Sequence, residues 1–419
     1  MNCRHCRHSL EHVFLDLGFA PPSNAYLSAA DLRKAESYLP LKLLVCTNCW
    51  LVQTEDYTAA AELFRPDYAY FSSVSQSWLD HCARYVHDVV HRFSLGTGSY
   101  VVEIASNDGY LLRNFVTRRI PCLGIEPTAS TASTAEANGI PTLRSFFTAQ
   151  VAAGMAAQGK RADLIIGNNV YAHVPDINDF TAGLKTLLQP NGVITLEFPH
   201  LLHLMQETQF DTVYHEHFSY LSLFTVRRMF EAAGLKVWDI QRLSTHGGSL
   251  RVFGCHAEDP RAVSPTVSAL VTEEKEAGLH ALAAYEVFQG RANRIKNEFL
   301  QYLLQQTEAG KKVAGYGAAA KGNTLLNFAG VKPDLLPYIC DAAPSKQGRF
   351  TPGSHIPILS PAELRLRRPD IVLVLPWNIA EEVIAQHSYI CEWGGRFVTI
   401  LPKLRVFDSA SMRNERITS

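Results

Sequence analysis

Residues 99–115 read SYVVEIASNDGYLLRNF, and this stretch decides the fold. Its apolar part, Tyr100–Ile104, has the composition of a strand that is buried on both faces. Small and polar residues follow it and predict a turn, and the apolar spacing from near Tyr110 predicts a helix. A buried strand that passes through a turn into a helix is typical of a parallel sheet with crossover helices.

The alternation of strand and helix continues along the chain. Further strands are predicted in PCLGIEPT (121–128), TLRSF (142–146), ADLIIGNNV (162–170) and GVITLEF (192–198), with helical patterns between most of them. A hairpin in 238–257 is predicted to close the sheet. The repeated pattern predicts a doubly wound α/β domain that binds its ligand at the C-terminal ends of the strands.

The turn after the first strand is not a dinucleotide-binding turn. A dinucleotide fingerprint reads G-x-G-x-x-G, whereas residues 103–109 read EIASNDG. The acidic start is similar to the E/D-x-G-x-G-x-G turn of class I methyltransferases, which holds S-adenosylmethionine (SAM), although Ala105 and Asn107 replace two of its glycines. Glu126, which ends the second strand, is then expected to accept hydrogen bonds from the ribose hydroxyls.

Four of the nine cysteines form two C-x-x-C pairs near the N-terminus. The first pair is Cys3 and Cys6, and the second is Cys46 and Cys49. Two such pairs can place four thiolates around one Zn²⁺ ion, which leaves no open position for catalysis. We therefore predict a structural zinc that stabilises a small N-terminal segment.

The stretch 214–220 reads YHEHFSY and brings several proton-handling groups together. If the chain is extended there, alternation places Tyr214 and Glu216 on one face and His215 and His217 on the other. Such groups are suited to general acid–base catalysis. A polar loop with solvated histidines is the alternative, and the stretch alone does not decide between the two.

The last third begins a second strand–turn–helix unit. Gly315, Gly317 and Ala320 fit the relaxed dinucleotide fingerprint, and Asp341 lies at the end of the next predicted strand. An NAD-dependent oxidoreductase is therefore an alternative function. Further strands in 370–378 and 396–402 predict a second, smaller Rossmann-like domain, joined to the first by a helical pattern over 265–308.

Composition excludes several classes of protein. The 419 residues carry a formal net charge of −1, and 47% of them are hydrophobic. This balance gives no basic field for nucleic acid, and no apolar run is long enough for a signal peptide or a membrane span. We expect a cytoplasmic protein without a nucleic-acid or membrane partner, and a monomer, because no long amphipathic surface is left unexplained.

Several motifs in order resemble one enzyme family. EIASNDGYLL, GIEP, NNVYAHV, YHEHFSY and HGGSLR follow a segment with two C-x-x-C pairs. Together they resemble the SAM-dependent nucleotide-sugar C-methyltransferases over essentially the whole chain. The resemblance implies four parts: 1–66 zinc-binding, 67–258 SAM-binding, 259–308 connecting helices, and 309–419 a Rossmann-like domain that helps to hold the sugar nucleotide.

The resemblance also implies a reaction. The expected substrate is a nucleoside diphosphate 4-keto-deoxyhexose, methylated at carbon 3 after a proton next to the ketone is removed; methylation at carbon 5 is the alternative. His217 is the expected base, because its pKa suits neutral pH, and Glu216 is expected to orient it or to bind the sugar. Tyr214 and His173 are candidates for positioning or for the enolate oxygen.

Binding residues follow from the same resemblance. The cofactor is expected to contact Glu103, Ala105, Ser106, Asn107, Gly109, Tyr110, Glu126, Pro127, Phe146, Asn168 and Asn169. The substrate is expected to contact Tyr68, Tyr70, Ser72, Ser73, His246, Lys321 and Asn323. Two of these assignments have structural alternatives: the turn with His246 could be an ordinary hairpin turn, and Lys321 could be a solvated helix lysine. The aromatic residues near 68–71 could likewise pack at a domain junction.

Overall fold

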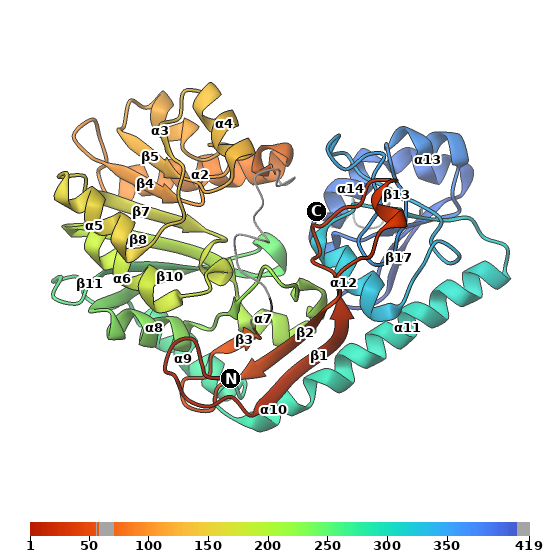
Figure 1. The fold of residues 1–419 in the computed structure, drawn as a ribbon, viewed down its shortest axis with the longest axis horizontal. Coiled ribbons are helices and arrows are strands. Elements are labelled where there is room, and N and C mark those ends of the chain that lie inside the picture. The colour runs from red at the N-terminus through yellow and green to blue at the C-terminus, as the bar shows by residue number, and fades with distance from the viewer. Residues whose placement is uncertain (56, 58–70, 409–419) are drawn as a thin grey trace. The chain divides into compact units, whose positions relative to one another are not determined.

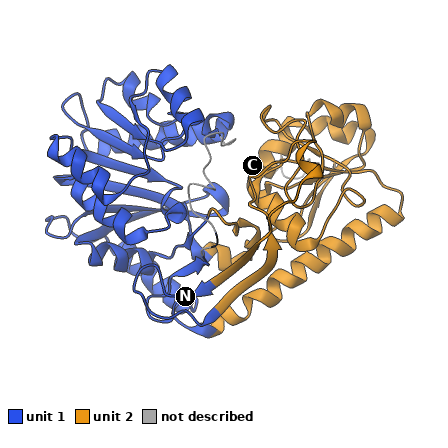
Figure 2. Cartoon of the chain, viewed as in Figure 1, with its two compact units in different colours: residues 1–12, 44–202, 217–282 blue, residues 13–43, 203–216, 283–419 orange. Residues whose placement is uncertain are grey.

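The computed structural model describes residues 1–55, 57 and 71–408. The chain divides into two compact units, each built from three separate segments (Figure 2). The first unit contains residues 1–12, 44–202 and 217–282, and the second contains residues 13–43, 203–216 and 283 onwards. Each unit is therefore described by itself, and the four-part division expected from the sequence stays a prediction.

The first unit contains a seven-stranded sheet in the order β10-β11-β8-β7-β4-β5-β6 (Figure 1). The strands β4 to β8 are parallel, whereas β10 and β11 form an antiparallel hairpin at one edge. Their bounds are β4 (Val101–Ile104), β5 (Cys122–Ile125), β6 (Thr142–Leu143), β7 (Ala162–Asn168), β8 (Leu188–Pro199), β10 (Leu235–Leu243) and β11 (Ser249–His256). The α/β prediction, including each predicted strand and the closing hairpin, is confirmed.

Helices cover both faces of this sheet. The amphipathic helix α2 buries Tyr85, Val86 and Val89 against β4 and its neighbours, and Ser75 caps its N-terminus. On the other face, Phe180 and Phe230 both pack against Tyr171. The helices are α2 (Gln76–Arg92), α3 (Arg113–Thr117), α4 (Ala129–Ala137), α5 (Ala149–Ala157), α6 (Ile177–Leu187) and α8 (Leu223–Ala232), and the short 3₁₀ turns are η2 (Ser72–Val74), η3 (Tyr171–His173) and η5 (Thr245–Gly247).

The helix after β4 begins later than its sequence predicts. The apolar pattern starts near Tyr110, but α3 begins at Arg113. Ala105, Asn107 and Gly109 all have positive φ, so the chain makes a wider turn before a helix can start. At Gly109 a Cβ atom would lie 2.7 Å from Cγ1 of Ile140, so glycine is also needed for packing.

Further elements lie outside the seven-stranded sheet, and α11 (Phe288–Glu308) among them belongs to the second unit. The short strands β3 (Val52–Thr54) and β9 (Ser219–Tyr220) pair antiparallel. The helical pattern over 265–308 is not one helix, because Gly278 adopts a φ of 85° after α9 ends. The elements of this region are α7 (Leu201–Gln206), α9 (Pro265–Glu276), α10 (Leu282–Glu286) and α11 (Phe288–Glu308).

The second unit contains a six-stranded sheet in the order β14-β13-β12-β15-β16-β17. All of its pairs are parallel except β16 with β17, so it is a mixed Rossmann-like sheet. Its strands are β12 (Val313–Tyr316), β13 (Ile339–Cys340), β14 (Ile358–Leu359), β15 (Ile371–Val374), β16 (Arg396–Thr399) and β17 (Arg405–Phe407), and its helices are α12 (Ala320–Ala329), α13 (Ala362–Arg367) and α14 (Ala380–Gln386). The other elements are β1 (His12–Ala20), η1 (Asp31–Arg33), β2 (Leu39–Val45), η4 (Phe210–Thr212), η6 (Trp377–Ile379) and η7 (Ser388–Trp393).

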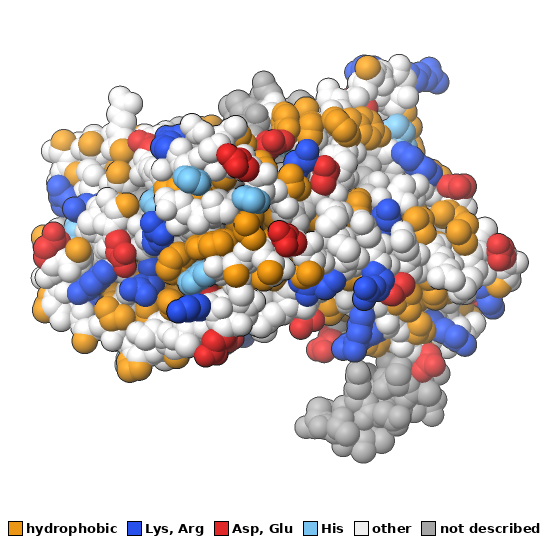
Figure 3. All heavy atoms as spheres, turned by 90° about the horizontal axis from the view of Figure 1, so that it is seen from below, with side chains coloured by type: hydrophobic (Ala, Val, Ile, Leu, Met, Phe, Trp, Pro, Cys, Tyr) orange, Lys and Arg blue, Asp and Glu red, His pale blue; other side chains and the backbone are white. Residues whose placement is uncertain are grey.

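The surface carries charges of both signs. On the face drawn in Figure 3, Lys and Arg side chains alternate with Asp and Glu side chains, without a broad patch of one sign. Within the described residues, no helix combines the length and the apolar character needed to cross a membrane.

Candidate active site

The four cysteines of the two C-x-x-C pairs form one cluster in the first unit. Their sulfur atoms all lie within 4.8 Å of one another, and the Cys3–Cys49 and Cys6–Cys46 distances are both 3.5 Å. A zinc ion with Zn–S bonds of about 2.3 Å places its sulfurs roughly 3.8 Å apart, so the four thiols fit a tetrahedral site. The next residue after each pair has a φ of 61°, which gives both knuckles the same turn.

Arg4, inside the first knuckle, links the cysteine cluster to other parts of the unit. Its side chain is 5% exposed and donates hydrogen bonds to the carbonyl oxygens of Phe218 (3.2 Å), Thr54 (2.9 Å) and Pro175 (3.2 Å). The guanidinium also lies 5.0 Å from the centre of the Phe218 ring. Arg4 thus fixes the main chain beside His217 and two residues after His173.

Glu126 closes the turn at the C-terminal edge of the seven-stranded sheet. Its carboxylate accepts hydrogen bonds from the backbone N–H of Asn107 (2.9 Å) and of Thr128 (2.9 Å), and from the Thr128 hydroxyl. A carboxylate has about four acceptor positions. Glu126 can therefore hold this turn and still accept a hydrogen bond from a ligand hydroxyl.

Several buried polar atoms at the same edge have no hydrogen-bond partner among the described residues. They are the Ser106 hydroxyl, Oδ1 of Asp108 and both side-chain atoms of Asn168. Burial raises the pKa of the Glu103 carboxyl well above its ordinary value, and a hydrogen bond with Tyr110 only partly opposes this. Buried polar groups normally have partners, so these atoms fit a polar cofactor such as SAM at the ends of β4 and β7.

The segment before α2 lies against this turn. The backbone N–H groups of Ser72 and Ser73 donate to the side chains of Asn107 (3.0 Å) and Asp108 (3.2 Å). The predicted substrate residues Ser72 and Ser73 thus contact the predicted cofactor turn. Their predicted neighbours Tyr68 and Tyr70 lie outside the described residues. Among the other cofactor candidates, Phe146 is 42% exposed after β6, and Pro127 follows Glu126.

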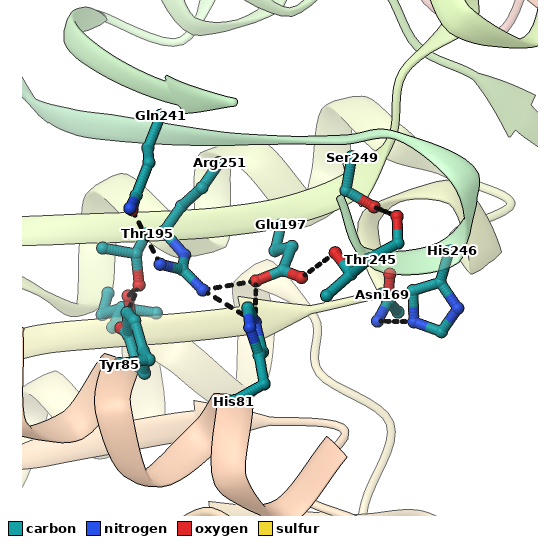
Figure 4. A network of polar contacts seen from close by, with 11 residues as sticks. His81, Tyr85, Asn169, Thr195, Glu197, Gln241, Thr245, His246, Ser249 and Arg251 are labelled. Carbon is teal, nitrogen blue, oxygen red and sulfur yellow. Dashed lines mark hydrogen bonds and ion pairs between the residues drawn. The ribbon is translucent and has the colours of Figure 1, made fainter. Parts of the chain in front are cut away.

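Asn169 and His246 are in contact in the structure, although the sequence assigns Asn169 to the cofactor and His246 to the substrate. Nδ2 of Asn169 lies 3.1 Å from Nε2 of His246 (Figure 4). Trp78 packs against the imidazole with a ring separation of 5.3 Å, and against Tyr110 at 6.1 Å. A buried network around Glu197 lies beside the pair (Figure 4).

His173 and His217 form a pair of imidazoles in the first unit. Their ring centres are 4.6 Å apart with an edge-to-face angle of 77°, and the Tyr220 ring lies 5.9 Å from His217. The main chain of His217 is held by the Thr54 hydroxyl, which donates to its carbonyl oxygen at 3.4 Å. Only Ser219 and Tyr220 of the YHEHFSY stretch form a strand, because a turn at His215 and Glu216 interrupts the extended chain.

The first half of the same stretch belongs to the second unit. Glu216 is 2% exposed, and Oε1 accepts a hydrogen bond from Nδ2 of Asn24 at 2.8 Å. His215 is also buried, and its Nε2 lies 3.2 Å from the carbonyl oxygen of Pro40. Burial lowers the pKa of His215. These contacts make His215 a structural histidine, whereas Tyr214 is partly exposed.

Asp341 is the acidic residue of the second, dinucleotide-like turn, and its carboxylate already binds groups of the protein. Asp341 accepts hydrogen bonds from the backbone N–H of Ala318 and of Ala343, both at 2.8 Å. The Lys346 ammonium lies 3.4 Å from the same carboxylate and donates to the Ala318 carbonyl oxygen at 2.9 Å. A ribose hydroxyl would have to displace these contacts, which argues against an NAD site.

The helix α12 carries the two residues that the sequence assigns to the pyrophosphate. Nζ of Lys321 donates to Asn378 at 3.2 Å and lies over the Trp377 ring. Burial lowers the pKa of Lys321 to about 8, although the charge of Asp211 opposes this. Asn323 is 1% exposed, and its Nδ2 donates to the Ser23 carbonyl oxygen at 2.6 Å.

Three protein families match consecutive parts of the chain. Residues 3–64 match a zinc binding domain, residues 78–240 match a methyltransferase domain, and residues 244–402 match a C-methyltransferase C-terminal domain. The chain is also 35% identical to C-methyltransferase NovU of Streptomyces niveus, over 98% of this chain and 97% of NovU. The chain belongs to the SAM-dependent C-methyltransferases. In this C-methyltransferase the cysteine cluster is the zinc site, and SAM is the methyl donor.

Two solved structures are distantly similar to this C-methyltransferase. Magnesium protoporphyrin IX methyltransferase (ChlM) from Synechocystis PCC 6803, with bound SAH, is 14% identical with a TM-score of 0.36, over 44% of this chain and 88% of that chain. The PH0226 protein of Pyrococcus horikoshii OT3 is 12% identical with a TM-score of 0.36, over 48% of this chain and 100% of that chain. Neither similarity bears on the function.

Sequence reasoning missed several polar residues of this C-methyltransferase. Arg4, Asn24 and Glu197 each hold a predicted site residue or its neighbour, but none was itself selected as a site residue. For Glu197 a signal was present, because it is an acidic residue at the end of a strand predicted to be buried. For Arg4 and Asn24 no local pattern indicates a partner that lies far along the chain.

Proposed function

We propose that this C-methyltransferase methylates carbon 3 of a nucleoside diphosphate 4-keto-deoxyhexose, with His217 as the general base. The pairing of the buried His217 imidazole with His173 at 4.6 Å is the observation that carries the proposal. A carbon next to a ketone loses a proton because the resulting enolate is stabilised by resonance. Imidazole is the side chain whose ordinary pKa suits this step near neutral pH.

The proton and the electrons follow a simple path. His217 takes the proton from carbon 3, and the electrons of the broken C–H bond move into the enolate, whose oxygen becomes negative. SAM, when bound, supplies an electrophilic methyl group on a sulfonium. With SAM bound, the enolate carbon would form the new C–C bond to that methyl group as the S–CH3 bond breaks; the electron pair of that bond stays on sulfur, S-adenosylhomocysteine leaves, and the ketone is restored. His217 then releases its proton to solvent.

The other site residues are assigned supporting roles. Asn24 fixes the Glu216 carboxylate at 2.8 Å, so we assign Glu216 to a sugar hydroxyl or to the orientation of His217. His173 and Tyr214 are assigned to the enolate oxygen, where a hydrogen-bond donor stabilises the developing charge. The zinc is assigned no part in this step, because the four cysteine ligands leave it no open coordination position.

Each unit has its own candidates for substrate binding. In the first, His246, Ser72 and Ser73 are the candidates, together with Tyr68 and Tyr70. In the second, Lys321 at the N-terminal end of α12 is the candidate for the pyrophosphate, since a helix N-terminus and an ammonium both favour anions. Asn323 supports that helix end through its bond to Ser23. Methylation at carbon 5, which also lies next to the ketone, is the alternative outcome.

The substitution His217→Asn tests the assignment of the base. We expect turnover to fall by about 10²–10⁴-fold, the usual contribution of a general base, with SAM affinity unchanged. The measurements are turnover of 4-keto-deoxyhexose nucleotides, deuterium exchange at carbon 3, and SAM binding by calorimetry. NMR of the product distinguishes carbon 3 from carbon 5.

His215→Asn is the matched control, because His215 is as buried as His217 and its Nε2 lies 3.2 Å from the carbonyl oxygen of Pro40. We expect lower stability but turnover close to that of the unsubstituted protein. Equal losses in both variants, or deuterium exchange that persists in His217→Asn, would show that His217 is not the base.

A further inference from the structure

The Glu197 carboxylate lies at the centre of a buried polar network in the first unit (Figure 4). It is fully buried at the C-terminal end of β8 and has three partners from three other elements. Oε2 accepts from Nη2 of Arg251 on β11 at 2.5 Å and lies 3.1 Å from Nε2 of His81 on α2. Oε1 accepts from the Thr245 hydroxyl in η5 at 2.9 Å.

Glu197 stays ionised over the working pH range. Burial raises its pKa, but the hydrogen bond with His81 and the charge of Arg251 outweigh burial and bring the pKa down to about 2. A group that remains a carboxylate in this way does not exchange protons with a substrate near neutral pH. Its role is therefore to hold other groups in place.

Two residues in left-handed conformation depend on Glu197. The backbone N–H of Asn169, whose φ is 53°, donates to the Glu197 carbonyl oxygen at 2.7 Å. His246, whose φ is 55°, directly follows Thr245, which the Glu197 carboxylate holds. Non-glycine residues in this conformation are uncommon and persist where the surroundings over-determine them, often at functional sites.

The side chains of these two residues meet at the sheet edge. Nδ2 of Asn169 can only donate, so in this arrangement Nε2 of His246 is the acceptor. Oδ1 of Asn169 is buried and has no hydrogen-bond partner among the described residues. Trp78 packs between His246 and Tyr110, which belongs to the turn after β4.

We propose that Glu197 is a positioning residue: through its carbonyl oxygen and its carboxylate it holds the Asn169–His246 pair so that the Asn169 amide faces the methyl donor and His246 faces the methyl acceptor. The proposal rests on the proposed function for the acceptor, and on the donor lying at the C-terminal ends of β4 and β7. It adds Glu197, Thr245, Arg251 and His81 to the residues that the reaction requires.

Stability alone does not account for the network. Burying a carboxylate and a guanidinium costs desolvation energy that their attraction often fails to recover, so an apolar pair of similar volume is frequently as stable. The Arg251 guanidinium is further fixed by Gln241 at 2.9 Å and by the Tyr85 ring at 4.3 Å. Such fixed geometry is suited to orienting reacting groups, because small displacements of those groups cause large losses of rate.

Thr245→Val gives the mildest test, because it removes only the hydroxyl that joins η5 to Glu197. We expect turnover at saturating substrate to fall roughly tenfold, with SAM affinity and substrate KM within about twofold of the unsubstituted values, since orientation rather than binding is lost. Thr245→Ser keeps the hydroxyl and is expected to restore turnover. Calorimetry, initial rates and thermal unfolding of all variants provide the measurements.

Thr181→Val is the matched control for loss of a buried threonine hydroxyl. Thr181 is 1% exposed in the same unit, and its hydroxyl bonds to Tyr171 at 2.8 Å and to the Ile177 carbonyl oxygen at 2.6 Å. We expect a similar loss of thermal stability but unchanged turnover. Unchanged turnover in Thr245→Val, failure of Thr245→Ser to restore it, or equal losses in Thr181→Val would overturn the proposal.

¹⁵N NMR of His246 separates this proposal from the proposed function. We expect a neutral imidazole protonated on Nδ1 in the unsubstituted protein and in Thr245→Ser, and a tautomer mixture in Thr245→Val. If no 4-keto sugar nucleotide is methylated, the proposed function fails, while the NMR result still decides whether Glu197 holds His246. An unchanged His246 spectrum in Thr245→Val overturns the positioning role.

Discussion

The two mixed sheets of this C-methyltransferase build the same turn around an acidic residue. In the first unit Glu126 accepts from the N–H of Asn107 in the preceding turn and from the N–H of Thr128, two residues on. In the second unit Asp341 accepts from the N–H of Ala318 in the corresponding turn and from Ala343, again two residues on. The backbone chemistry of the two strand ends is therefore equivalent.

The difference lies in what surrounds each carboxylate. Lys346 pairs with Asp341 and also binds the Ala318 carbonyl oxygen, while Tyr26 donates to that same oxygen. Glu126 has no basic partner among the described residues, and the atoms near it at the ends of β4 and β7 include unpaired donors and acceptors. A fingerprint at a strand end thus identifies the turn, whereas the neighbouring side chains decide whether a nucleotide can bind.

Paired substitutions of the two acidic residues give the largest expected contrast. If Glu126 binds the ribose as we propose, Glu126→Gln removes charge-assisted hydrogen bonds and is expected to weaken SAM binding by about ten- to a hundredfold. Asp341→Asn leaves the buried Lys346 without its counter-ion and is expected to cost roughly 2–4 kcal/mol of stability, with SAM affinity unchanged. Calorimetry with SAM and NAD, and urea unfolding, provide the measurements. If the unsubstituted protein binds NAD, or if Asp341→Asn weakens SAM binding, the two acidic residues do not differ in the way described.

The two turn glycines provide an intermediate contrast. Gly109 and Gly317 have φ values of 78° and 85°, and a Cβ atom would lie 2.7 Å from Ile140 and 2.5 Å from Pro376, respectively. Alanine at either position is expected to cost about 1–3 kcal/mol of stability, through strain and overpacking. Only Gly109→Ala is expected to weaken SAM binding, since that turn is the one to which we assign the donor. Equal SAM affinity in the two variants would contradict this expectation.

The smallest expected effect concerns the pH dependence of stability. The contributions of Glu197 in the first unit and Asp211 in the second should change in opposite directions as the pH rises. The depressed pKa of Glu197 contributes stability above about pH 4.3 that is lost as the pH falls towards about 2. Burial raises the pKa of Asp211 in the second unit to about 6, despite Lys321 and the Trp377 hydrogen bond. Its contribution therefore falls as the pH rises from about 3.9 to about 6, by on the order of 1 kcal/mol per pH unit.

Two isosteric variants check these signs. Glu197→Gln should flatten the acid side of the stability curve, and Asp211→Asn should flatten the slope between pH 4 and pH 6, because the amide oxygen can still accept from Trp377. Urea unfolding midpoints at a series of pH values provide the comparison. An unchanged pH profile in Asp211→Asn would show that another group controls the slope.

The sequence predicts the parts of this protein that depend on local patterns. The strands β4 to β8, the hairpin and the second sheet follow from apolar periodicity, and the zinc cluster follows from cysteine spacing. The late start of α3 does not follow, because the positive φ values of Ala105 and Asn107 are imposed by the tertiary surroundings rather than by residue type. The break after α9 was also missed, although Gly278 provided a signal.

For the candidate site, too, some assignments follow from the sequence and others need the tertiary structure. His217, Glu216 and the turn around Gly109 can be selected from the sequence, because their chemistry is carried by short motifs. The sequence did not separate His215 from His217; the two are equally buried, and the contact of the His215 Nε2 with the Pro40 carbonyl oxygen is what distinguishes His215. Nor did it exclude the dinucleotide interpretation of Asp341, which depends on Lys346 and Tyr26.

By itself, the sequence determined the fold class, the zinc ligands and the class of chemistry, since these depend on periodicity, spacing and residue type. Only the tertiary structure decided which polar groups are free to act. Arg4 reaches Phe218, and Glu197 reaches Thr245, across long stretches of chain. Hydrogen bonds between distant segments form only after the hydrophobic core has brought those segments together, so no local pattern can encode them.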